Sequence, residues 1–539
     1  MKRIANFPIV SGIAAAACLA ALAACGAGLA TDVQVVPGEL DAHIRFLSDD
    51  LLEGRALGGR GIEAAALYQE SRFREYGLEP AFGGSFRQTF PLRGCRLDPQ
   101  ASLEVRGAKR AVPLVQGSDF LLKTYRPDAP AAVEAAALYC GFLIQAPERQ
   151  WDDLKGADVK GKILICEINE PGNAPGGIFD GEDMTYYGRW PYKFEKAAAL
   201  GAAGCLIIHN TKGAAYGWDT LRNGWMRESF FLPDVPQVLL FQGWLSGEAA
   251  DRMFTAAGFN RAALAAAAEK PAFTPVPLKI NIRARQRPSF RSVSVSNVAA
   301  VRHAVPAGGE ERFVVVSAHY DHLGLNESLP GHKIFNGAVD NCSASATMLA
   351  LARYYAREKN PRVGIIFAAV TAEEELMLGS EYFARHLPVS ASRILGDINL
   401  EMTNVWGETE DVYAIGASHS DLDEIAAQAA SRMGLRYTPE RNRELGYFFR
   451  SDQISFARHG IPAVWLHEGV VSKTKGPDYM PAKAADYVNN KYHKPADQIE
   501  KDWDLAGAVQ IARWAEGIIA ILAERPGLPQ FKPTSSFKR

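Results

Sequence analysis

Acidic and histidine side chains follow several apolar, strand-like segments in the second half of this sequence. In open α/β sheets, ligand sites form beyond the carboxyl ends of the strands, so we expect these side chains to meet at one edge of a sheet. Imidazole and carboxylate groups without thiolates are a ligand set suited to zinc or a similar divalent ion. The candidate residues are His319, Asp321, Asp340, Glu373, Glu374, Glu401 and His493.

Each candidate taken alone also has a structural explanation. Acidic residues favour the first turn of a helix, where they interact with the helix dipole, and an Asp before a helix is commonly an N-cap. A single His beside a strand is usually structural. The joint order of the candidates and their placement at strand ends favour a site.

A regular alternation of strands and helices from about residue 290 would position these residues. The periodicity predicts strands at 313–318, 362–371, 394–402 and 461–466, and helices at 344–358, 376–387, 421–432 and 505–524. Such alternation predicts an α/β fold with a mostly parallel central sheet that is covered on both faces by helices.

Two other regions differ in texture. Residues 38–80 have a helical pattern, and Gly77 is a natural stop for a helix over 61–76. Residues 93–285 are expected to be β-rich, because short apolar runs alternate there with loops rich in Gly and Pro. These runs predict strands at 101–105, 135–139, 162–168, 204–209 and 238–240, and residues 171–190 form a long loop.

The N-terminus resembles an export signal. Lys2 and Arg3 precede an apolar, Ala-rich run to Ala24, and Leu22-Ala23-Ala24-Cys25-Gly26 resembles a bacterial lipobox. This resemblance implies cleavage before Cys25 and acylation of that cysteine. We therefore expect an exported protein that contacts the membrane through a lipid anchor at Cys25, on the periplasmic side, with the choice of inner or outer membrane open.

Composition bounds the remaining possibilities. The 539 residues are 47% hydrophobic and 22% charged, which predicts a globular chain of several folded units. A net charge of −2 offers no electrostatic footprint for nucleic acid. The cysteines after the signal match no zinc-knuckle spacing and are expected to be buried thiols. They are Cys95, Cys140, Cys166, Cys205 and Cys342.

The motifs around these residues resemble one family. In chain order they read H-x-D, V-D-N, T-A-E-E with L-G-S, N-L-E-M, and Y-H-x-P, from His319 to Pro495. This order is similar to the co-catalytic zinc aminopeptidases of the aminopeptidase Y type, which have a zinc exopeptidase fold. The segments LLEGR at 51–55 and RSDQISFARHGIPAV at 450–464 also resemble that family, and residues 93–285 resemble the protease-associated domain inserted in many members.

The resemblance implies a cofactor of two zinc ions. By motif position, His319 and Glu401 would hold one zinc, Glu374 and His493 would hold the other, and Asp340 would bridge them. The family usually has Asp at position 401, so Glu401 is a departure whose extra methylene can shift the carboxylate.

The resemblance also assigns three residues that do not bind metal. Glu373 would be the general base that takes the proton of the attacking water, leaving a metal-bridged hydroxide, and passes that proton to the departing amine. Asp321 would orient His319, and Tyr492 would donate toward the developing oxyanion. His322 and Glu375 are expected to be bystanders at the rim.

We therefore predict a zinc-dependent aminopeptidase that hydrolyses N-terminal residues from peptides, including dipeptides; its oligomeric state stays open. A carboxypeptidase or dipeptidase on the same fold would need a cation for the substrate carboxylate, which Arg450 or Arg189 could supply. A one-zinc glutaminyl cyclase and a non-catalytic, receptor-like ectodomain are two further possibilities. The expected divisions are a signal peptide at 1–24, an N-terminal helical part at 25–92, the insert at 93–285, the peptidase domain at 286–525 and a flexible tail at 526–539.

Overall fold

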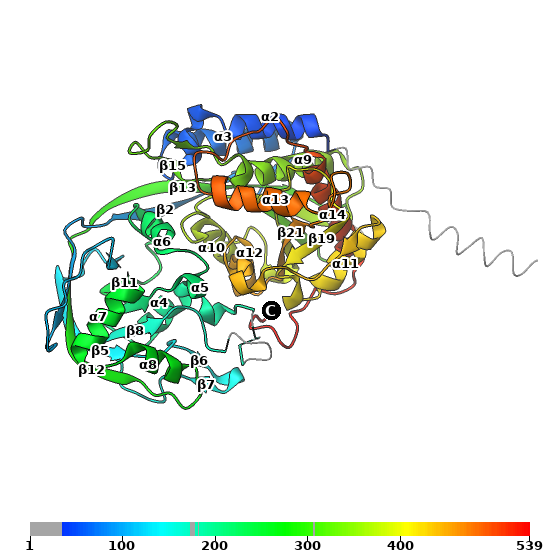
Figure 1. Ribbon diagram of the computed structural model, residues 1–539. Helices are drawn as coiled ribbons and strands as arrows, with labels where there is room; N and C mark the ends of the chain where they lie inside the picture. The colour runs from blue at the N-terminus through cyan, green and yellow to red at the C-terminus, as the bar shows by residue number, and fades with distance from the viewer. Residues whose placement is uncertain (1–34, 173–177, 180, 182, 306–307) are drawn as a thin grey trace, which may run out of the picture.

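The computed structural model describes residues 35–539 apart from 173–177, 180, 182 and 306–307 (Figure 1). The predicted signal peptide and Cys25 lie outside these described residues. The chain builds two large sheets, one of 10 strands and one of seven. In Figure 1 the smaller sheet, with β5, β8, β11 and β12, lies below and to one side of the larger one.

The larger sheet has a parallel centre and antiparallel flanks. Its order is β10-β2-β13-β17-β14-β18-β21-β19-β20, and β1 pairs with β13. The strands are β1 (Glu79–Pro80), β2 (Arg87–Arg96), β10 (Ser229–Phe231), β13 (Ser289–Arg302), β14 (Phe313–His319), β17 (Gly364–Val370), β18 (Ile394–Asn399), β19 (Asp411–Ile415), β20 (Arg436–Tyr437) and β21 (Ala463–Glu468).

The prediction of a mostly parallel sheet is wrong, because the sheet is mixed. The neighbours β17, β14, β18 and β21 are parallel, whereas β13 is antiparallel to both β17 and β2, and β19 is antiparallel to β21. The regular alternation of strands and helices in the sequence predicts only the parallel strands at the centre of the sheet. Strands β2 and β13 lie outside it, and their half-exposed residues resemble loop sequence.

Helices cover both faces of this sheet. Strands β14 and β17 are apolar without interruption because both of their faces are buried. On one face, Ile365 and Phe367 of β17 join the core with α2, α3, α9, α11 and α14. On the other face, Ile366 joins a smaller core with Phe383 of α10 and Phe456 of α12.

Five helices around the larger sheet, α3, α9, α10, α11 and α14, lie close to the positions that the sequence predicts. Gly77 ends α3 in a left-handed conformation, as predicted. The helices are α2 (Pro37–Leu47), α3 (Arg60–Tyr76), α9 (Ala344–Arg357), α10 (Leu378–Arg385), α11 (Leu422–Arg432), α12 (Gln453–Arg458), α13 (Tyr479–Asp486) and α14 (Ala506–Glu524).

Helix α14 is long and apolar enough to cross a membrane by length and composition alone. About two thirds of its apolar window, 67%, is buried inside the protein. It packs through residues such as Trp514 and Ile518 into the main core. Its composition is therefore accounted for by core packing.

The second sheet occupies much of the predicted insert. Its order is β3-β12-β5-β8-β9-β11-β4, with a parallel centre from β5 to β11. The strands are β3 (Ser102–Arg106), β4 (Phe120–Lys123), β5 (Ala132–Tyr139), β8 (Ile163–Glu167), β9 (Gly204–Ile208), β11 (Phe241–Leu245) and β12 (Val276–Arg285). The last predicted strand, 238–240, is replaced by β11, and likeness to a protease-associated domain stays a prediction.

Short elements complete the second sheet's region and the rest of the chain. The helices are α4 (Trp190–Ala199), α5 (Thr211–Ala214), α6 (Trp218–Trp225), α7 (Gly247–Ala257) and α8 (Arg261–Ala268). Two small hairpins pair β6 (Gln145–Ala146) with β7 (Trp151–Asp152) and β15 (Gly324–Leu325) with β16 (Ile334–Phe335). The five described cysteines are free and buried, as expected.

The C-terminal segment, expected to be a flexible tail, makes defined contacts. The backbone N–H of Lys532 donates to the carbonyl of His419 at 2.8 Å. The Phe537 ring lies 5.7 Å from the Phe448 ring, and the Arg539 guanidinium donates to the carbonyl of Ile394 at 2.7 Å.

Arg55, in the LLEGR segment, is a fully buried link between distant parts of the chain. It is 1% exposed, and its guanidinium donates to the carbonyls of Tyr320 at 2.8 Å, Leu47 at 2.6 Å and Asn336 at 2.6 Å. Tyr320 follows β14, and Asn336 precedes the segment that carries Asp340. Arg55 therefore fixes two site-bearing loops against the N-terminal helices.

We expect Arg55→Lys to destabilise the protein by about 2–4 kcal/mol, because an ammonium group cannot reproduce the guanidinium fork and leaves buried carbonyls without donors. Chemical denaturation measures the change. The matched variant Arg60→Lys, at a side chain 95% exposed, should shift the free energy of unfolding by no more than about 0.5 kcal/mol. Equal stability of the two variants would contradict the role given to Arg55.

Candidate metal centre

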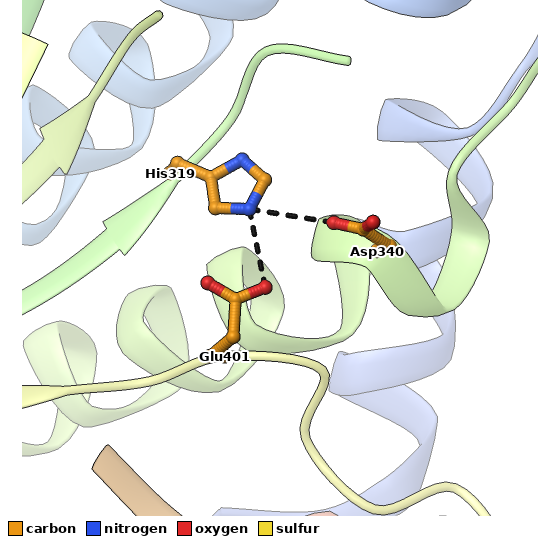
Figure 2. A group of neighbouring side chains, drawn as sticks. All are labelled: His319, Asp340 and Glu401. Atoms are coloured by element: carbon orange, nitrogen blue, oxygen red, sulfur yellow. Dashed lines mark hydrogen bonds and ion pairs between the residues drawn. The ribbon is translucent and has the colours of Figure 1, made fainter. Parts of the chain in front are cut away.

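One group of possible metal ligands forms around His319, the last residue of β14. Its Nε2 atom lies 3.2 Å from Glu401 Oε1 and 3.4 Å from Asp340 Oδ1 (Figure 2). All three residues are buried, and one ligand atom from each lies within 4.8 Å of the others. In Figure 2 both carboxylates point toward the same nitrogen of the ring.

A second group shares Asp340 with the first. His493 Nε2 lies 3.2 Å from the other carboxylate oxygen of Asp340, Oδ2, and 3.3 Å from Glu374 Oε2. His322 also reaches this group, with Nδ1 at 2.6 Å from Glu374 Oε1. Asp340 thus faces one group with each of its oxygens.

The parallel centre of the larger sheet brings these groups together. His319 pairs in register with Val370 at the end of β17, and Glu373 and Glu374 follow three and four residues later. Glu401 follows β18, which pairs with the other side of β14. The carboxyl ends of three adjacent parallel strands therefore supply most of the two groups, as expected for this class of sheet.

Glu373 lies beside both groups and belongs to neither. Its Oε2 atom is 4.0 Å from His319 Nε2, and its side chain is 12% exposed. Burial raises the pKa of Glu373 well above its ordinary value, the His319 charge opposes that shift, and the nearby charges of Glu401 and Asp452 add to it. A buried carboxyl of this kind is suited to holding and releasing a proton.

Asp321 organises the loop that carries the paired glutamates. Its Oδ1 accepts the backbone N–H of Glu373 at 3.1 Å, and its Oδ2 accepts that of Glu374 at 3.4 Å. Its Oδ1 also lies 3.7 Å from His319 Nδ1, whose nearer contact is the backbone carbonyl of Asp321 at 3.3 Å. Besides the predicted contact with His319, Asp321 thus holds the glutamate backbone.

Asp497 fixes the shared carboxylate. It accepts the backbone N–H groups of Val339 at 2.9 Å and Asp340 at 3.1 Å, and the hydroxyl of Tyr487 at 3.0 Å. Burial raises the pKa of Asp497 to about 6, although the two backbone N–H groups oppose the shift. A buried carboxyl group, that of Asp497, therefore supports the backbone of Asp340 from outside the two groups.

Glu401, the departure from the family pattern, is held on several sides. The hydroxyl of Ser451 donates to its Oε2 at 2.7 Å, and the indole N–H of Trp465 donates to its backbone carbonyl at 3.0 Å. The longer side chain still places Oε1 beside His319.

Tyr492 and Glu375 lie at the margin. The Tyr492 ring stacks on the His493 ring with centroids 3.9 Å apart, and the residue is 39% exposed. Glu375 turns away from both groups, and its Oε2 accepts the backbone N–H of Phe230 at 3.1 Å. Glu375 thus contacts β10, the edge strand of the larger sheet.

The charge of the centre fits divalent cations. Burial lowers the pKa of His319, but the carboxylates of Glu401 and Asp340 raise it well above its usual range. Among the described residues, no Lys or Arg side chain forms an ion pair with Asp340, Glu374 or Glu401. Buried carboxylates need a compensating charge, and oxygen and imidazole donors suit zinc.

Sequence reasoning missed two contributors. His322 was expected at the rim, yet it contacts Glu374, and only its position directly after His319-Tyr320-Asp321 hinted at this. The only sequence feature that pointed to Asp497 was its position two residues after Pro495 in the Y-H-x-P motif. Its role depends on how the loop after His493 packs against the backbone of Asp340, which sequence patterns do not show.

A protein-family model matches the part of the chain that holds these groups. It describes peptidase family M28 and covers residues 297–516. A probable zinc metalloprotease from Pyrenophora teres f. teres (strain 0-1) is 30% identical over 148 residues, which are 27% of this chain and 30% of that protein. A probable zinc metalloprotease from Leptosphaeria maculans is 34% identical over 112 residues, 20% of this chain and 25% of that protein. The chain therefore spans less than a third of the length of these curated relatives.

A solved structure extends the likeness to nearly the whole chain at the level of the fold. An aminopeptidase from Aneurinibacillus sp. strain AM-1 has a TM-score of 0.52 and 20% identity, with 93% of this chain and 97% of that chain covered. Residues 297–516 thus match peptidase family M28, and the solved structure shares the fold of nearly the whole chain.

Proposed function

We propose that this protein is a zinc-dependent aminopeptidase that holds two zinc ions and releases N-terminal residues from peptides. The observation that carries the proposal is the position of Asp340, whose two oxygens face His319 and His493 at 3.4 Å and 3.2 Å. A carboxylate between two such groups is suited to joining two cations. A single-zinc glutaminyl cyclase would leave the second group without a role.

Each cation would have its own protein ligands. His319 and Glu401 would hold one zinc, Glu374 and His493 the other, and Asp340 both. Of the two histidines near Glu374, we assign His493 as the ligand because its Nε2 approaches both Asp340 and Glu374. The His322 ring also has a nitrogen within 4.8 Å of Asp340, but its short contact, at 2.6 Å, is with Glu374, and it would orient that carboxylate.

The protein's own groups would handle the proton and the developing charge. Bound zinc supplies Lewis-acid polarisation of the scissile carbonyl and lowers the pKa of a water. Glu373 would accept the proton of the attacking water and pass it to the departing amine. Asp321 would hold Glu373 and Glu374 through their backbone N–H groups, and Tyr492 would donate its hydroxyl to the oxyanion.

The proposal for location rests on sequence alone. The lipobox-like segment that ends at Cys25 supports export and a lipid anchor. The peptidase would then act on peptides outside the cytoplasm.

We expect metal removal to abolish activity. Chelation should eliminate hydrolysis of aminoacyl-anilides, and added zinc should restore it. Asp340→Asn should lower the zinc content measured by elemental analysis from about two per chain to below one, because it weakens both groups. Asp478→Asn, at an exposed position, should retain both metals. Full activity in chelated protein would exclude a metalloenzyme.

The two histidines near Glu374 should behave differently. His493→Ala should lose one zinc, leaving about one per chain, because a ligand is deleted. His322→Ala should keep both at saturating zinc but bind one of them about 10- to 100-fold more weakly, as expected for a residue that orients a ligand. Competitive titration with a chromophoric chelator measures the difference. The reverse result would assign the ligand role to His322.

Glu373→Gln should keep both metals and lose nearly all turnover, because the amide cannot accept a proton. General-base catalysis contributes about 10²–10⁴ in rate, which sets the minimum expected loss in kcat. The exposed Glu444→Gln is the matched control and should be fully active. Normal turnover by the Glu373 variant would remove this residue from the mechanism.

A further inference from the structure

Two arginines, Arg189 and Arg450, lie where the part of the chain that forms the second sheet (the second region, residues 93–285) meets the part that forms the larger sheet. Arg189 directly precedes α4 of the second region, and Arg450 follows the short turn Tyr447–Phe449. The two segments touch, since the ring of Tyr186 lies 5.8 Å from that of Phe449. The backbone N–H of Arg189 donates to the carbonyl of Tyr186 at 3.1 Å.

Neither guanidinium has an anionic partner in the described part of the chain. Arg189 is 8% exposed, and its Nε is buried without a hydrogen-bond partner. The Nε and Nη2 atoms of Arg450 are also buried without a hydrogen-bond partner. The Arg450 guanidinium lies 5.8 Å from the centre of the Tyr447 ring. Burial, together with the charge of Arg450, lowers the pKa of Arg189 to about 9.

Other arginines at this junction are paired. Arg443 lies 3.1 Å from Asp183, and Arg458 lies 3.1 Å from Glu195. The carboxylates of Asp183 and Glu195 are thus engaged with these other arginines. Two buried cations without an anion are costly unless a ligand supplies the opposite charge.

Arg450 is connected to the candidate metal centre. Arg450 directly precedes Ser451, whose hydroxyl donates to Glu401 at 2.7 Å. The Arg450 guanidinium lies 5.8 Å from the centre of the Tyr447 ring, and that ring lies 6.1 Å from the ring of Trp465, whose indole N–H donates to the carbonyl of Glu401 at 3.0 Å. These contacts connect the guanidinium to the groups that would act on a peptide bond.

We propose that Arg189 and Arg450 form a carboxylate-binding subsite for the peptide substrate. Guanidinium groups bind carboxylates through paired, charge-assisted N–H donors. The carboxylate would be the C-terminal group of a short peptide or an acidic side chain, two sources with the same chemistry. This inference rests on the proposed peptidase function and narrows it to peptides that carry a carboxylate close to the scissile bond.

The test compares three substrates of the zinc-loaded, full-length enzyme. They are the dipeptide Leu-Ala, its C-terminal amide, and Leu-Glu amide, in which only the side chain is acidic. We expect kcat/KM to be about 10- to 100-fold higher for a carboxylate-bearing peptide than for Leu-Ala amide, the effect of one or two charge-assisted hydrogen bonds. Preference for Leu-Ala identifies the C-terminal group as the source, and preference for Leu-Glu amide identifies the side chain.

Variants then test the two arginines. Arg189→Gln and Arg450→Gln should each bring the ratio of carboxylate-bearing to amidated substrate toward one. Arg441→Gln, at an exposed position nine residues before Arg450, should leave the ratio unchanged. Thermal unfolding of each variant reports whether it is folded.

A binding measurement separates this inference from the proposed function. In Glu373→Gln protein, calorimetry should give a dissociation constant about 10- to 100-fold lower for the preferred carboxylate peptide than for Leu-Ala amide. If the enzyme hydrolyses none of the three peptides, the proposed function fails, yet this difference in binding would still support the subsite. Equal binding of all three peptides, or an unchanged ratio in both folded arginine variants, would overturn it.

Discussion

Uncompensated negative charge is the constraint on which the rest of the site depends. The Asp340 carboxylate lies within 4.8 Å of those of Glu401 and Glu374, and the three side chains are no more than 6% exposed. In the described chain, only imidazole groups form ion pairs with these carboxylates. The carboxylates in turn raise the pKa of His319 and His493, which favours the charged form of each ring. Such an arrangement persists only if the surrounding fold is rigid enough to hold it and if cations complete it.

The scaffold supplies that rigidity through backbone groups rather than through further charges. Asp321 and Asp497 accept N–H groups from the two loops that carry Glu373 and Asp340. Asn297, on β13, donates to the carbonyl of Gly379 at 2.8 Å and accepts the N–H of Thr371 at 3.0 Å, which brackets the glutamate loop. The backbone positions of Asp340 and Glu374 are thus set by hydrogen bonds to side chains that lie outside the two groups.

The sequence predicted the parallel strands and the residues at their ends because both follow from local pattern. Apolar runs mark β14, β17 and β18, and a strand's end determines where His319, Glu373 and Glu401 emerge. Strands β2 and β13 escaped notice because they are long and antiparallel, and exposed or half-exposed polar residues interrupt most of their length. The contacts of His322 and Asp497 depend on how loops return after the strands, and periodicity carries no information about that path.

Strand β10 joins the two regions of the chain. It lies within the second region of the chain, yet it pairs with β2 at the edge of the larger sheet, and the N–H of Phe230 binds Glu375. Lys123, at the end of β4, donates to the hydroxyl of Ser229 in β10. Residues 93–285 are therefore not a separable module. Deleting them as one segment would remove an edge strand of the larger sheet, and it would also remove the contact that holds Glu375, the residue next to Glu373 and Glu374. Any evolutionary loss or laboratory deletion of this region would have to replace that strand at the same time.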